Sequence, residues 1–373
     1  MKVLVTGGAG FIGSHIVDRC LREGLRVRVL DNLDPKIHPN GRPSYLAREI
    51  DFIEGDVTDR ATLVHALRDV DFVSHQAAYQ DYMPDFSRFI HVNTTGTALI
   101  YELIVQHGLP IKKIIVASSQ AVYGEGQFQC PQHGLFLPQP RSQRQLTAGE
   151  WEVKCSQCAK DSTPLLLTED HTNPFNQYAV SKLAEEKIAL GLGWLHGIPT
   201  VALRYSITQG PRQSLYNHYS GVCRIFFSNA LQNQPLCIYE DGDQTRDFVH
   251  VQDVVDANML VLEKSEADFQ AFNVASGKAV TINEYAHRVL ELVGSQTHSQ
   301  VLREYRRGDN RHSVSSANKL MKLGWHPRRD LSTIMEDFHA WINDIGGIPV
   351  RIPDASSAMR DAGVLLAAAT SVG

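Results

Sequence analysis

The chain has 373 residues, of which 43% are hydrophobic and 21% charged, and its formal net charge is −5. These values fit one large or two fused globular domains with a full hydrophobic core. The small negative charge argues against an electrostatic nucleic-acid partner, and no apolar run is long enough to span a membrane. The N-terminal segment is too short for a signal-peptide core, and six cysteines do not resemble a secreted disulfide framework, so a cytoplasmic protein is expected.

The first two hundred residues alternate short runs rich in Val, Ile and Phe with helical patterns. The predicted strands are Lys2–Thr6, Arg26–Leu30, Asp51–Gly55, Asp71–His75, Lys113–Ser118 and Thr200–Tyr205, and Thr97–Gly108 is a predicted helix. Such alternation predicts an α/β fold with a doubly wound parallel sheet and right-handed crossovers. We assign residues 1–205 to this domain, with an insertion at residues 125–170.

After Gly210 three helical stretches alternate with short strands, and residues 206–345 are predicted to form mainly a smaller α/β lobe that closes over a ligand. Residues 346–373 are rich in Gly, Pro and small apolar side chains. We expect a loosely held tail with one short helix, or alternatively a segment that docks a partner. Cys20, Cys223 and Cys237 have apolar neighbours and are expected to be buried.

A glycine-rich turn follows the first predicted strand and opens a helix, in the stretch VTGGAGFIGSH. Gly7, Gly10 and Gly13 permit a tight turn and let backbone N–H groups approach a pyrophosphate. Asp31 ends the second strand, where a carboxylate binds ribose hydroxyls and repels a 2′-phosphate, which favours NAD over NADP. Asp56 ends the third strand, next to the expected adenine ring. Ordinary turn glycines and surface carboxylates are the alternative.

The stretch YAVSK places Tyr178 and Lys182 on one face of a predicted helix, at positions i and i+4. A phenol has a pKa of about 10, and a nearby ammonium stabilises the phenolate, so this pair can supply a base near neutral pH. Ser118 and Ser119 end the fifth strand and offer hydroxyl groups there. The alternative is a solvated helix face.

Together these motifs resemble the extended short-chain dehydrogenase/reductases of the NAD-dependent nucleotide-sugar epimerase/dehydratase family, from about Met1 to Trp341. The matching stretches are TGGAGFIG, DNL, GDVTD, HQAA, HVNTTGT, SSQAVYG, YAVSK, QTRDFVHVQDVVDA and RRGDNRH. The resemblance implies a Rossmann domain that binds NAD, a lobe that binds a nucleoside diphosphate sugar, and a homodimer built from two helices of each subunit.

The resemblance also implies roles for particular residues. The catalytic set is Ser119, Tyr178 and Lys182. The implied NAD-binding residues are Gly7, Gly10, Phe11, Ile12, Gly13, Asp31, Asn32, Asp56, Val57, Ala77, Ala78, Asn93, Ser118, Tyr178 and Lys182. The implied substrate-binding residues are Ser119, Gln120, Ser206, Arg246 and Arg311, with the two arginines on the diphosphate. Ser206 departs from the family, which usually has Asn after RY, and this affects how the sugar is oriented.

The implied reaction is 4-epimerisation through a 4-keto sugar. Tyr178 takes the proton of a sugar hydroxyl while hydride passes to NAD, and Ser119 binds the developing ketone. Gln120 and Ala121 occupy the positions where dehydratases have an Asp-Glu pair, so dehydration is disfavoured. The alternatives are a 4-ketosugar reductase on the same fold and a non-catalytic NAD-sensing or zinc-dependent interaction protein.

The insertion pairs a Cys-x-x-His with a Cys-x-x-Cys across a polar spacer. Cys130, His133, Cys155 and Cys158 fit a closed tetrahedral zinc site with a structural role, a zinc-ribbon-like insertion. A redox Cys-x-x-Cys and chance are the competing interpretations, and His171 is a reserve ligand. The inserted motifs resemble the dTDP-L-rhamnose 4-epimerase group, which implies conversion of dTDP-L-rhamnose to dTDP-6-deoxy-L-talose; a UDP-hexose or UDP-uronate 4-epimerase is the alternative.

Overall fold

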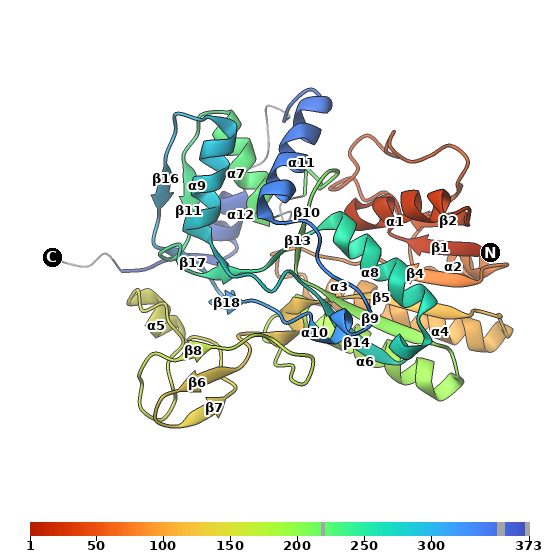
Figure 1. The fold of residues 1–373 in the computed structure, drawn as a ribbon, viewed down its shortest axis with the longest axis horizontal. Helices are drawn as coiled ribbons and strands as arrows, with labels where there is room; N and C mark the ends of the chain where they lie inside the picture. Colours follow the sequence, from red (N-terminus) through yellow and green to blue (C-terminus); the bar gives the residue numbers. More distant parts are fainter. Residues whose placement is uncertain (218–220, 349–354, 370–373) are drawn as a thin grey trace.

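A seven-stranded parallel sheet forms the centre of the protein (Figure 1). The computed structural model describes residues 1–217, 221–348 and 355–369. The sheet strands are β1 Lys2–Thr6, β2 Arg26–Asp31, β3 Asp51–Glu54, β4 Phe72–His75, β5 Lys113–Ser119, β9 Thr200–Tyr205 and β14 Gln270–Val274. Their order is β14-β9-β5-β4-β1-β2-β3, and every neighbouring pair is parallel. The predicted doubly wound sheet is therefore confirmed.

Helices cover both faces of the sheet because its strands are apolar on both sides, as in β9, where all six residues are buried. One face carries α2 Arg60–Leu67, α4 Gly96–His107 and α6 Gln177–His196, and the other carries α1 Phe11–Arg22 and α8 Val251–Glu263. Shorter helical segments are α3 Phe86–Phe89, η1 Ile90–Thr95 and η2 Gln120–Tyr123. None of the helices among the described residues is long and apolar enough to cross a membrane.

The chain crosses between the sheet and the lobe more than once. It leaves the sheet after β9, returns to add α8 and β14, and then leaves again. β14 pairs with β9 from Gln270 opposite Val201 to Val274 opposite Tyr205. Part of residues 206–345 therefore belongs to the Rossmann sheet rather than to the lobe, which local sequence patterns do not reveal.

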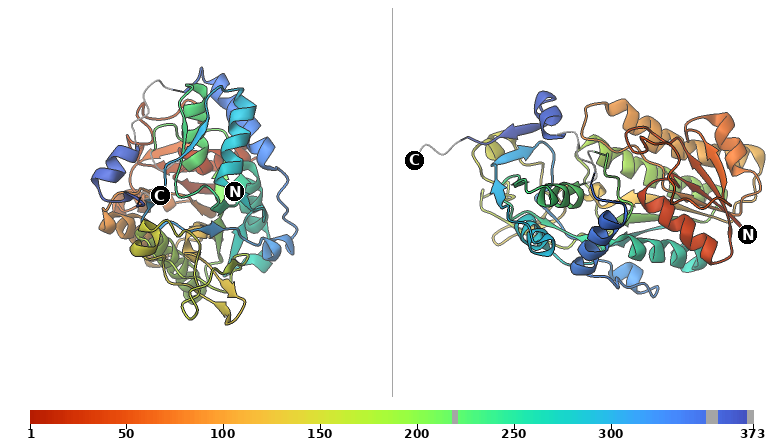
Figure 2. Two further views of the ribbon diagram at one scale, coloured as in Figure 1. Left: turned by 90° about the vertical axis from the view of Figure 1, so that its left-hand side faces the viewer. Right: turned by 90° about the horizontal axis from the view of Figure 1, so that it is seen from above.

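The lobe has its own apolar core, in which Phe226, Phe227, Tyr285 and Phe338 are buried. Its longer elements are α7 Gly221–Leu231, β11 Leu236–Ile238, α9 Ile282–Val293, β16 Ser299–Val301 and α11 Leu331–Asp344. Its shorter elements are β10 Ile207–Gln209, β12 Thr245–Arg246, β13 Phe248–His250, β15 Val280–Thr281, η3 Ser265–Ala267, β17 Glu304–Arg306, β18 His312–Ser313 and α10 Asn318–Met321. Figures 1 and 2 show α7, α9 and α11 together beyond one end of the sheet.

Two of the three cysteines outside the insertion are buried as predicted, Cys20 and Cys223. The prediction was wrong for Cys237, which is exposed. Its neighbours Leu236 and Ile238 are buried, and successive side chains of a strand point to opposite faces. Cys237 therefore faces away from the core of the lobe.

The insertion forms a small antiparallel sheet away from the parallel one, below β17 and β18 in Figure 1. The strands of this sheet are β6 Phe128–Cys130, β7 Gly134–Phe136 and β8 Thr163–Pro164, with β6 in the middle. The insertion also contains the short helix α5 Gln143–Thr147.

The described part of the C-terminal tail packs against the rest of the molecule. The expected short helix is present as α12 Ala355–Asp361, followed by β19 Leu365–Ala367, which pairs antiparallel with β17. Arg360 forms an ion pair with Glu304 at 2.8 Å, and the N–H of Ala369 donates to the carbonyl of Thr147 at 2.7 Å. The expectation of a loose tail is thus wrong for residues 355–369, and residues 349–354 and 370–373 lie outside the described residues.

Candidate active site

A cavity of about 1220 Å³ lies at the carboxyl ends of the parallel strands and extends along the lobe. Residues that follow β1, β2, β3, β4, β5 and β9 line one part, and residues of α7, β11 and β17 line the other. This volume exceeds the roughly 300–1,000 Å³ of sites that hold one small ligand. The cavity therefore has room for two extended ligands that meet at the sheet.

The glycine turn after β1 brings bare backbone to the cavity wall. Gly7 has φ +66°, and a side chain there would come within 2.7 Å of the backbone nitrogen of Ala77. A Cβ on Gly13 would lie 2.2 Å from the carbonyl oxygen of Gly7. Both positions therefore need glycine. The first turn of α1 has no acidic residue, so its N–H groups can bind a pyrophosphate.

Two carboxylates lie beside this turn, as the sequence predicts. Asp31 is 8% exposed and accepts hydrogen bonds from the N–H groups of Ala9 at 2.9 Å and Leu33 at 3.0 Å. Burial raises the pKa of Asp31, and these donors oppose that shift. Asn32 donates to Asp56 at 3.1 Å, which fixes the second carboxylate. Asp31, Asn32 and Asp56 all line the cavity.

The predicted base and hydroxyl meet at the centre of the cavity. Asn176 caps the start of α6 by accepting a hydrogen bond from the N–H of Ala179 at 2.8 Å, which fixes Tyr178 in the first turn. The hydroxyls of Tyr178 and Ser119 are hydrogen bonded. Burial raises the pKa of Tyr178, whereas the charge of Lys182 and the bond from Ser119 lower it. This is the arrangement that a proton-abstracting phenol requires.

The two serines at the end of β5 have different partners. Ser118 donates to the buried carboxylate of Glu186 at 2.8 Å, and Glu186 also binds the guanidinium of Arg204 at 2.7 Å. Ser119 is instead directed to Tyr178. Ser118 is therefore committed to the interior, and Ser119 is the hydroxyl available to a ligand.

A buried carboxylate beside Lys182 was missed from the sequence. The Nζ atom of Lys182 lies 2.6 Å from Oε2 of Glu185, and both side chains are at most 2% exposed. Burial raises the pKa of Glu185 to about 7, against the lowering effect of Lys182. The spacing i, i+3 on one helix was the signal that predicts such a pair.

Five buried polar atoms on the cavity wall have no hydrogen-bond partner among the described residues. They are Oε1 of Gln120, Oγ of Ser206, Nε of Arg224, Oε1 of Gln244 and Oγ of Ser313. Buried polar groups in native proteins are almost always satisfied, so an unsatisfied set on one wall indicates where a polar ligand binds. Gln120 and Ser206 were predicted for this role, and the other three were not.

Most of the predicted site residues line the cavity, and two do not. Those on the wall are Gly7, Gly10, Phe11, Ile12, Gly13, Asp31, Asn32, Asp56, Val57, Ala77, Ala78, Ser118, Ser119, Gln120, Tyr178, Lys182, Ser206 and Arg246. Asn93 is fully buried behind the wall, where it bonds to the backbone of Tyr79 and to Ser181. It supports the loop after β4 and does not reach the cavity.

Arg311 is the second residue that the structure places elsewhere. Its guanidinium is 1% exposed and is bound by the carboxylates of Glu152, Glu240 and Asp241 at 2.6–3.1 Å. Three carboxylates leave no free donor fork for a diphosphate. Arg306, in the same RRGD stretch, lines the cavity instead.

Arg306 is framed by aromatic side chains and a carboxylate. Its guanidinium carbon lies 4.6 Å from the ring centre of Tyr82 and 5.5 Å from that of Tyr239. Its Nε donates to Asp309 at 2.8 Å. Such stacking holds an arginine fork in a fixed plane beside a ligand.

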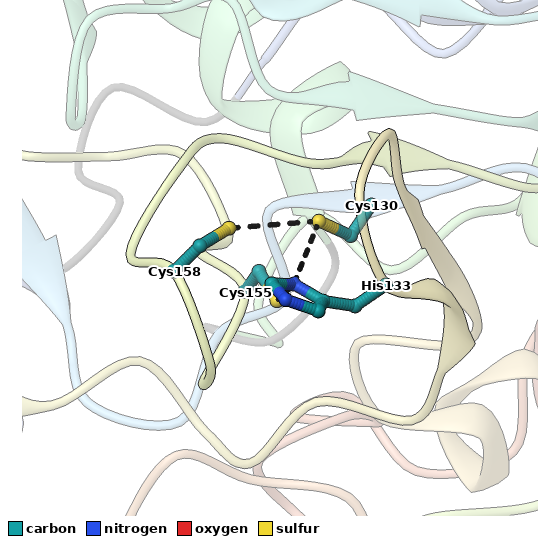
Figure 3. A group of neighbouring side chains, drawn as sticks. All are labelled: Cys130, His133, Cys155 and Cys158. Carbon is teal, nitrogen blue, oxygen red and sulfur yellow. Dashed lines mark hydrogen bonds between the residues drawn. The ribbon is translucent and has the colours of Figure 1, made fainter.

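The four predicted metal ligands converge in the insertion (Figure 3). Nδ1 of His133 lies 3.5 Å from Sγ of Cys130 and 3.4 Å from Sγ of Cys155, and Sγ of Cys130 lies 3.6 Å from Sγ of Cys158. A tetrahedral zinc with bonds of about 2.3 Å to sulfur and about 2.1 Å to nitrogen places its ligand atoms roughly 3.5–3.8 Å apart. The donor set and its spacing therefore fit zinc. His171 does not belong to this cluster.

Buried charges connect the insertion to the lobe beside the cavity. Arg141 binds Glu125 at 3.0 Å and Glu240 at 2.9 Å, and also donates to the carbonyl of Asp309 at 2.9 Å. Glu152 bonds to both Arg311 and His312. The position of the loop that carries Asp309 thus depends on a side chain of the insertion.

Comparison with known proteins identifies the family of the chain. The model of the NAD dependent epimerase/dehydratase family matches residues 3–145 and 156–275, and its break falls within the insertion. The chain is 33% identical over 348 residues to a dTDP-L-rhamnose 4-epimerase of Burkholderia thailandensis, covering 91% of this chain and 94% of that one. It is 30% identical to a putative UDP-glucose 4-epimerase of Methanocaldococcus jannaschii, covering 92% and 98%.

A solved structure shows the same likeness. UDP-glucose 4-epimerase of Thermus thermophilus in complex with NAD is 30% identical, with a TM-score of 0.72 over 92% of this chain and 99% of that one. This chain therefore belongs to the NAD dependent epimerase/dehydratase family. It is an enzyme of the NAD-dependent nucleotide-sugar epimerase class, and membership of that class does not identify the sugar.

Proposed function

We propose that the protein interconverts dTDP-L-rhamnose and dTDP-6-deoxy-L-talose by epimerisation at C4. The observation that carries the reaction type is the hydrogen-bonded pair Ser119 and Tyr178 beside Lys182, in a cavity that also contains the glycine turn. Support for the sugar comes from the Burkholderia relative and from the motifs of the insertion. The Methanocaldococcus relative supports a UDP-hexose as the alternative substrate. A UDP-uronate is a further alternative, because the same reaction at C4 would epimerise it.

The chemistry of each side chain follows from its position. A dinucleotide held at the glycine turn and Asp31 would supply a reversible acceptor for the hydride at C4. Tyr178 takes the proton of the C4 hydroxyl, Ser119 donates a hydrogen bond to the resulting ketone, and Lys182 stabilises the phenolate. The keto sugar then turns over in the cavity and Tyr178 gives the proton back. Gln120 and Ala121 follow Ser119 and cannot transfer a proton, so water is not eliminated.

Two features favour an epimerase over a 4-ketosugar reductase. A reductase must release its oxidised cofactor after each turnover, and such enzymes often use NADPH. Asp31 beside the glycine turn would disfavour a 2′-phosphate, and the loop after β4 packs closely against the turn at Gly7. A non-catalytic NAD sensor has no use for the Ser119, Tyr178 and Lys182 group.

We also propose that Cys130, His133, Cys155 and Cys158 bind one structural zinc. Four protein ligands leave no open coordination position for catalysis. The strands of the insertion are only two or three residues long, so a metal would supply cross-linking that such short elements lack. About one equivalent of zinc per chain, measured by elemental analysis of protein without a His-tag, is expected. The absence of zinc would leave the redox-pair and chance interpretations.

The proposed assembly is a cytoplasmic homodimer formed through α4 and α6. These helices pack together and expose the apolar side chains Val105, Val180, Trp194 and Leu195. Exposed apolar side chains gathered on neighbouring helices are typical of subunit interfaces. Six cysteines without a disulfide suit a reducing compartment. Light scattering should give twice the chain mass, and the mass of one chain would refute the dimer.

A panel of nucleotide sugars tests the proposed substrate. The NAD-loaded protein is incubated separately with dTDP-L-rhamnose, UDP-glucose, UDP-N-acetylglucosamine and UDP-glucuronate, and the products are separated by chromatography. We expect a 4-epimer from dTDP-L-rhamnose at the highest kcat/KM. A higher value for any UDP-sugar would replace the proposed substrate by that alternative.

A further inference from the structure

Arg224 is a buried arginine with few hydrogen-bond partners among the described residues. It lies on α7, is 1% exposed, and is one of the largest fully buried side chains among the described residues. Its one hydrogen bond is a long one, 3.4 Å from an Nη atom to the carbonyl of Leu215, and its Nε has no partner among the described residues. Among the described residues Arg224 forms no ion pair with a carboxylate, and the one electrostatic neighbour that affects its pKa is Tyr82. A buried charge without a partner is costly, so an anionic ligand is the expected compensation.

The position of Arg224 indicates where such an anionic ligand would bind. Arg224 lines the cavity, on the side of the lobe, and its nearest charged or phenolic neighbour is Tyr82. Tyr82 contacts Arg306 through its ring, and Arg306 interacts electrostatically with Arg246. Three guanidinium groups from α7, β12 and β17 thus converge on one part of the cavity, away from the glycine turn.

The charges of the three arginines are not equally available. Arg306 is paired with Asp309 at 2.7 Å. Arg246 donates to the backbone carbonyls of Thr245, Asn310 and Arg311 but has no carboxylate partner among the described residues. Arg224 has none either. Burial lowers the pKa of Arg224 to about 10, which still leaves it charged at neutral pH. Two guanidinium groups without a direct carboxylate ion pair among the described residues therefore line the cavity, and a nucleoside diphosphate sugar carries two negative charges on its diphosphate.

We propose that Arg224 binds the diphosphate of the nucleotide sugar together with Arg246, in the role that the sequence suggested for Arg311. The inference rests on the proposed nucleotide-sugar reaction and names a binding residue for it. The geometry explains why the role moves: Arg311 is held by three carboxylates, whereas Arg224 lines the cavity and its Nε has no partner among the described residues. A guanidinium with free N–H donors is well suited to phosphate oxygens.

The test is calorimetric titration of the NAD-loaded protein with UDP and with dTDP, for wild type, Arg224→Gln and Arg224→Lys. Loss of a buried charge partner should weaken both nucleotides by at least about 30-fold in Arg224→Gln. Arg224→Lys keeps the positive charge but lacks the planar guanidinium, so its nucleotide affinity should lie between those of wild type and Arg224→Gln. This variant therefore still tests the proposal if Arg224→Gln does not fold. The exposed Arg68, which is not on the cavity wall, provides the control Arg68→Gln, which should bind as wild type does.

Two further measurements, the melting temperature and the steady-state kinetic constants, separate a role in binding from a structural role. The melting temperature of Arg224→Gln without nucleotide should not fall, because the variant removes an uncompensated buried charge. In turnover, KM for the nucleotide sugar should rise while kcat changes little, since the diphosphate is bound equally in ground and transition states. A lower melting temperature with unchanged nucleotide affinity would assign Arg224 to the fold and overturn the inference.

The remaining outcomes distinguish this inference from the proposed function. Equal affinity of wild type and Arg224→Gln for UDP and dTDP would remove Arg224 from the diphosphate site and leave the proposed reaction intact. If UDP kept its affinity and UDP-glucuronate alone lost it, Arg224 would bind the sugar carboxylate instead. Failure of wild type to bind either nucleotide would contradict the proposed function and this inference together.

Discussion

At the scale of single residues, the state of Tyr178 is set by neighbours of opposite sign. Lys182 favours its phenolate, Glu185 opposes it, and burial opposes it most strongly. Since Glu185 lies 2.6 Å from Lys182, part of the positive charge that would activate the phenol is neutralised whenever Glu185 is ionised. Glu185 is therefore expected to act on the proposed catalytic residues Ser119, Tyr178 and Lys182 through its ion pair with Lys182.

Replacing Glu185 by Gln should change the pH dependence of the reaction in one direction. Burial raises the pKa of Glu185 to about 7, so the carboxylate is ionised above pH 7 and then raises the pKa of Tyr178. Without that negative charge the phenol deprotonates more readily, and kcat/KM of Glu185→Gln should reach its plateau at a lower pH than wild type. A plateau at the same or a higher pH would show that Glu185 does not influence the base. The remote exposed carboxylate Glu266 provides the control Glu266→Gln.

Removing the phenol hydroxyl tests the base itself. Tyr178→Phe keeps the packed ring, so it should fold and retain NAD, and kcat should fall by about a thousandfold or more, since general base and nearby positioning are lost together. Bound NAD is read from the absorption spectrum and turnover by chromatography. Activity close to wild type would show that another group takes the proton.

The identity of the dinucleotide depends on Asp31. Its carboxylate excludes a 2′-phosphate, so Asp31→Ala should weaken NAD binding by roughly tenfold or more and reduce the preference for NAD over NADP. Reconstitution of cofactor-free protein with each dinucleotide measures both quantities. An unchanged preference would place the adenosine ribose elsewhere.

At the scale of elements, short local patterns predicted the Rossmann sheet well because each strand and each turn is specified by neighbouring residues. β1 and β9 have the predicted bounds, and the turn of Gly7 is explained by its φ of +66°. The return of β14 to β9 was not predictable in the same way, because it depends on pairing between residues some seventy positions apart.

The site shows the same limit. Residues that follow a sheet strand were placed correctly, because the carboxyl ends of parallel strands meet at one edge. The predicted position of Arg311 on the cavity wall was wrong, because its carboxylate partners Glu152, Glu240 and Asp241 come from distant parts of the chain. Arg224 lies on α7 next to the apolar residues Ile225 and Phe226. An arginine in such surroundings indicates an internal role, and this signal was present in the local sequence.

The insertion is the element whose loss should affect sugar binding and spare NAD. Cys155→Ser with Cys158→Ser removes two of the four ligands, and we expect the insertion to lose its order while the Rossmann domain stays folded. Arg141 then no longer fixes the carbonyl of Asp309, so KM for the nucleotide sugar should rise on the order of tenfold with NAD content unchanged. Chelation of wild type should give the same result.

The outcome that would contradict this role is full activity of the double variant with normal KM. Cys20 supplies the matched control, because Cys20→Ser removes a thiol that belongs neither to the zinc cluster nor to the cavity wall. It should keep its zinc, and this separates the loss of the metal from the loss of a thiol as such.

At the scale of the whole molecule, three parts of the chain enclose one cavity. The parallel sheet supplies the glycine turn and the proton-transferring group, the lobe supplies the arginines, and the C-terminal helix α12 adds Ser356 and Met359 to the wall. The insertion and β19 support the lobe from outside. In the proposed reaction this division would let NAD remain at the sheet while the sugar nucleotide is held at the lobe and presents either face of its C4 carbon.

The fate of the hydrogen at C4 tests the central claim of NAD-dependent epimerisation most directly. Wild-type protein is incubated with dTDP-L-rhamnose, and in parallel with UDP-glucose, each carrying deuterium at C4, and products are analysed by mass spectrometry and proton NMR. The expected result is a 4-epimer that retains the deuterium at C4, with no NADH released, because the hydride that leaves one face is returned to the other. A product that has lost its deuterium, or a 4-keto sugar released with free NADH, would contradict the account.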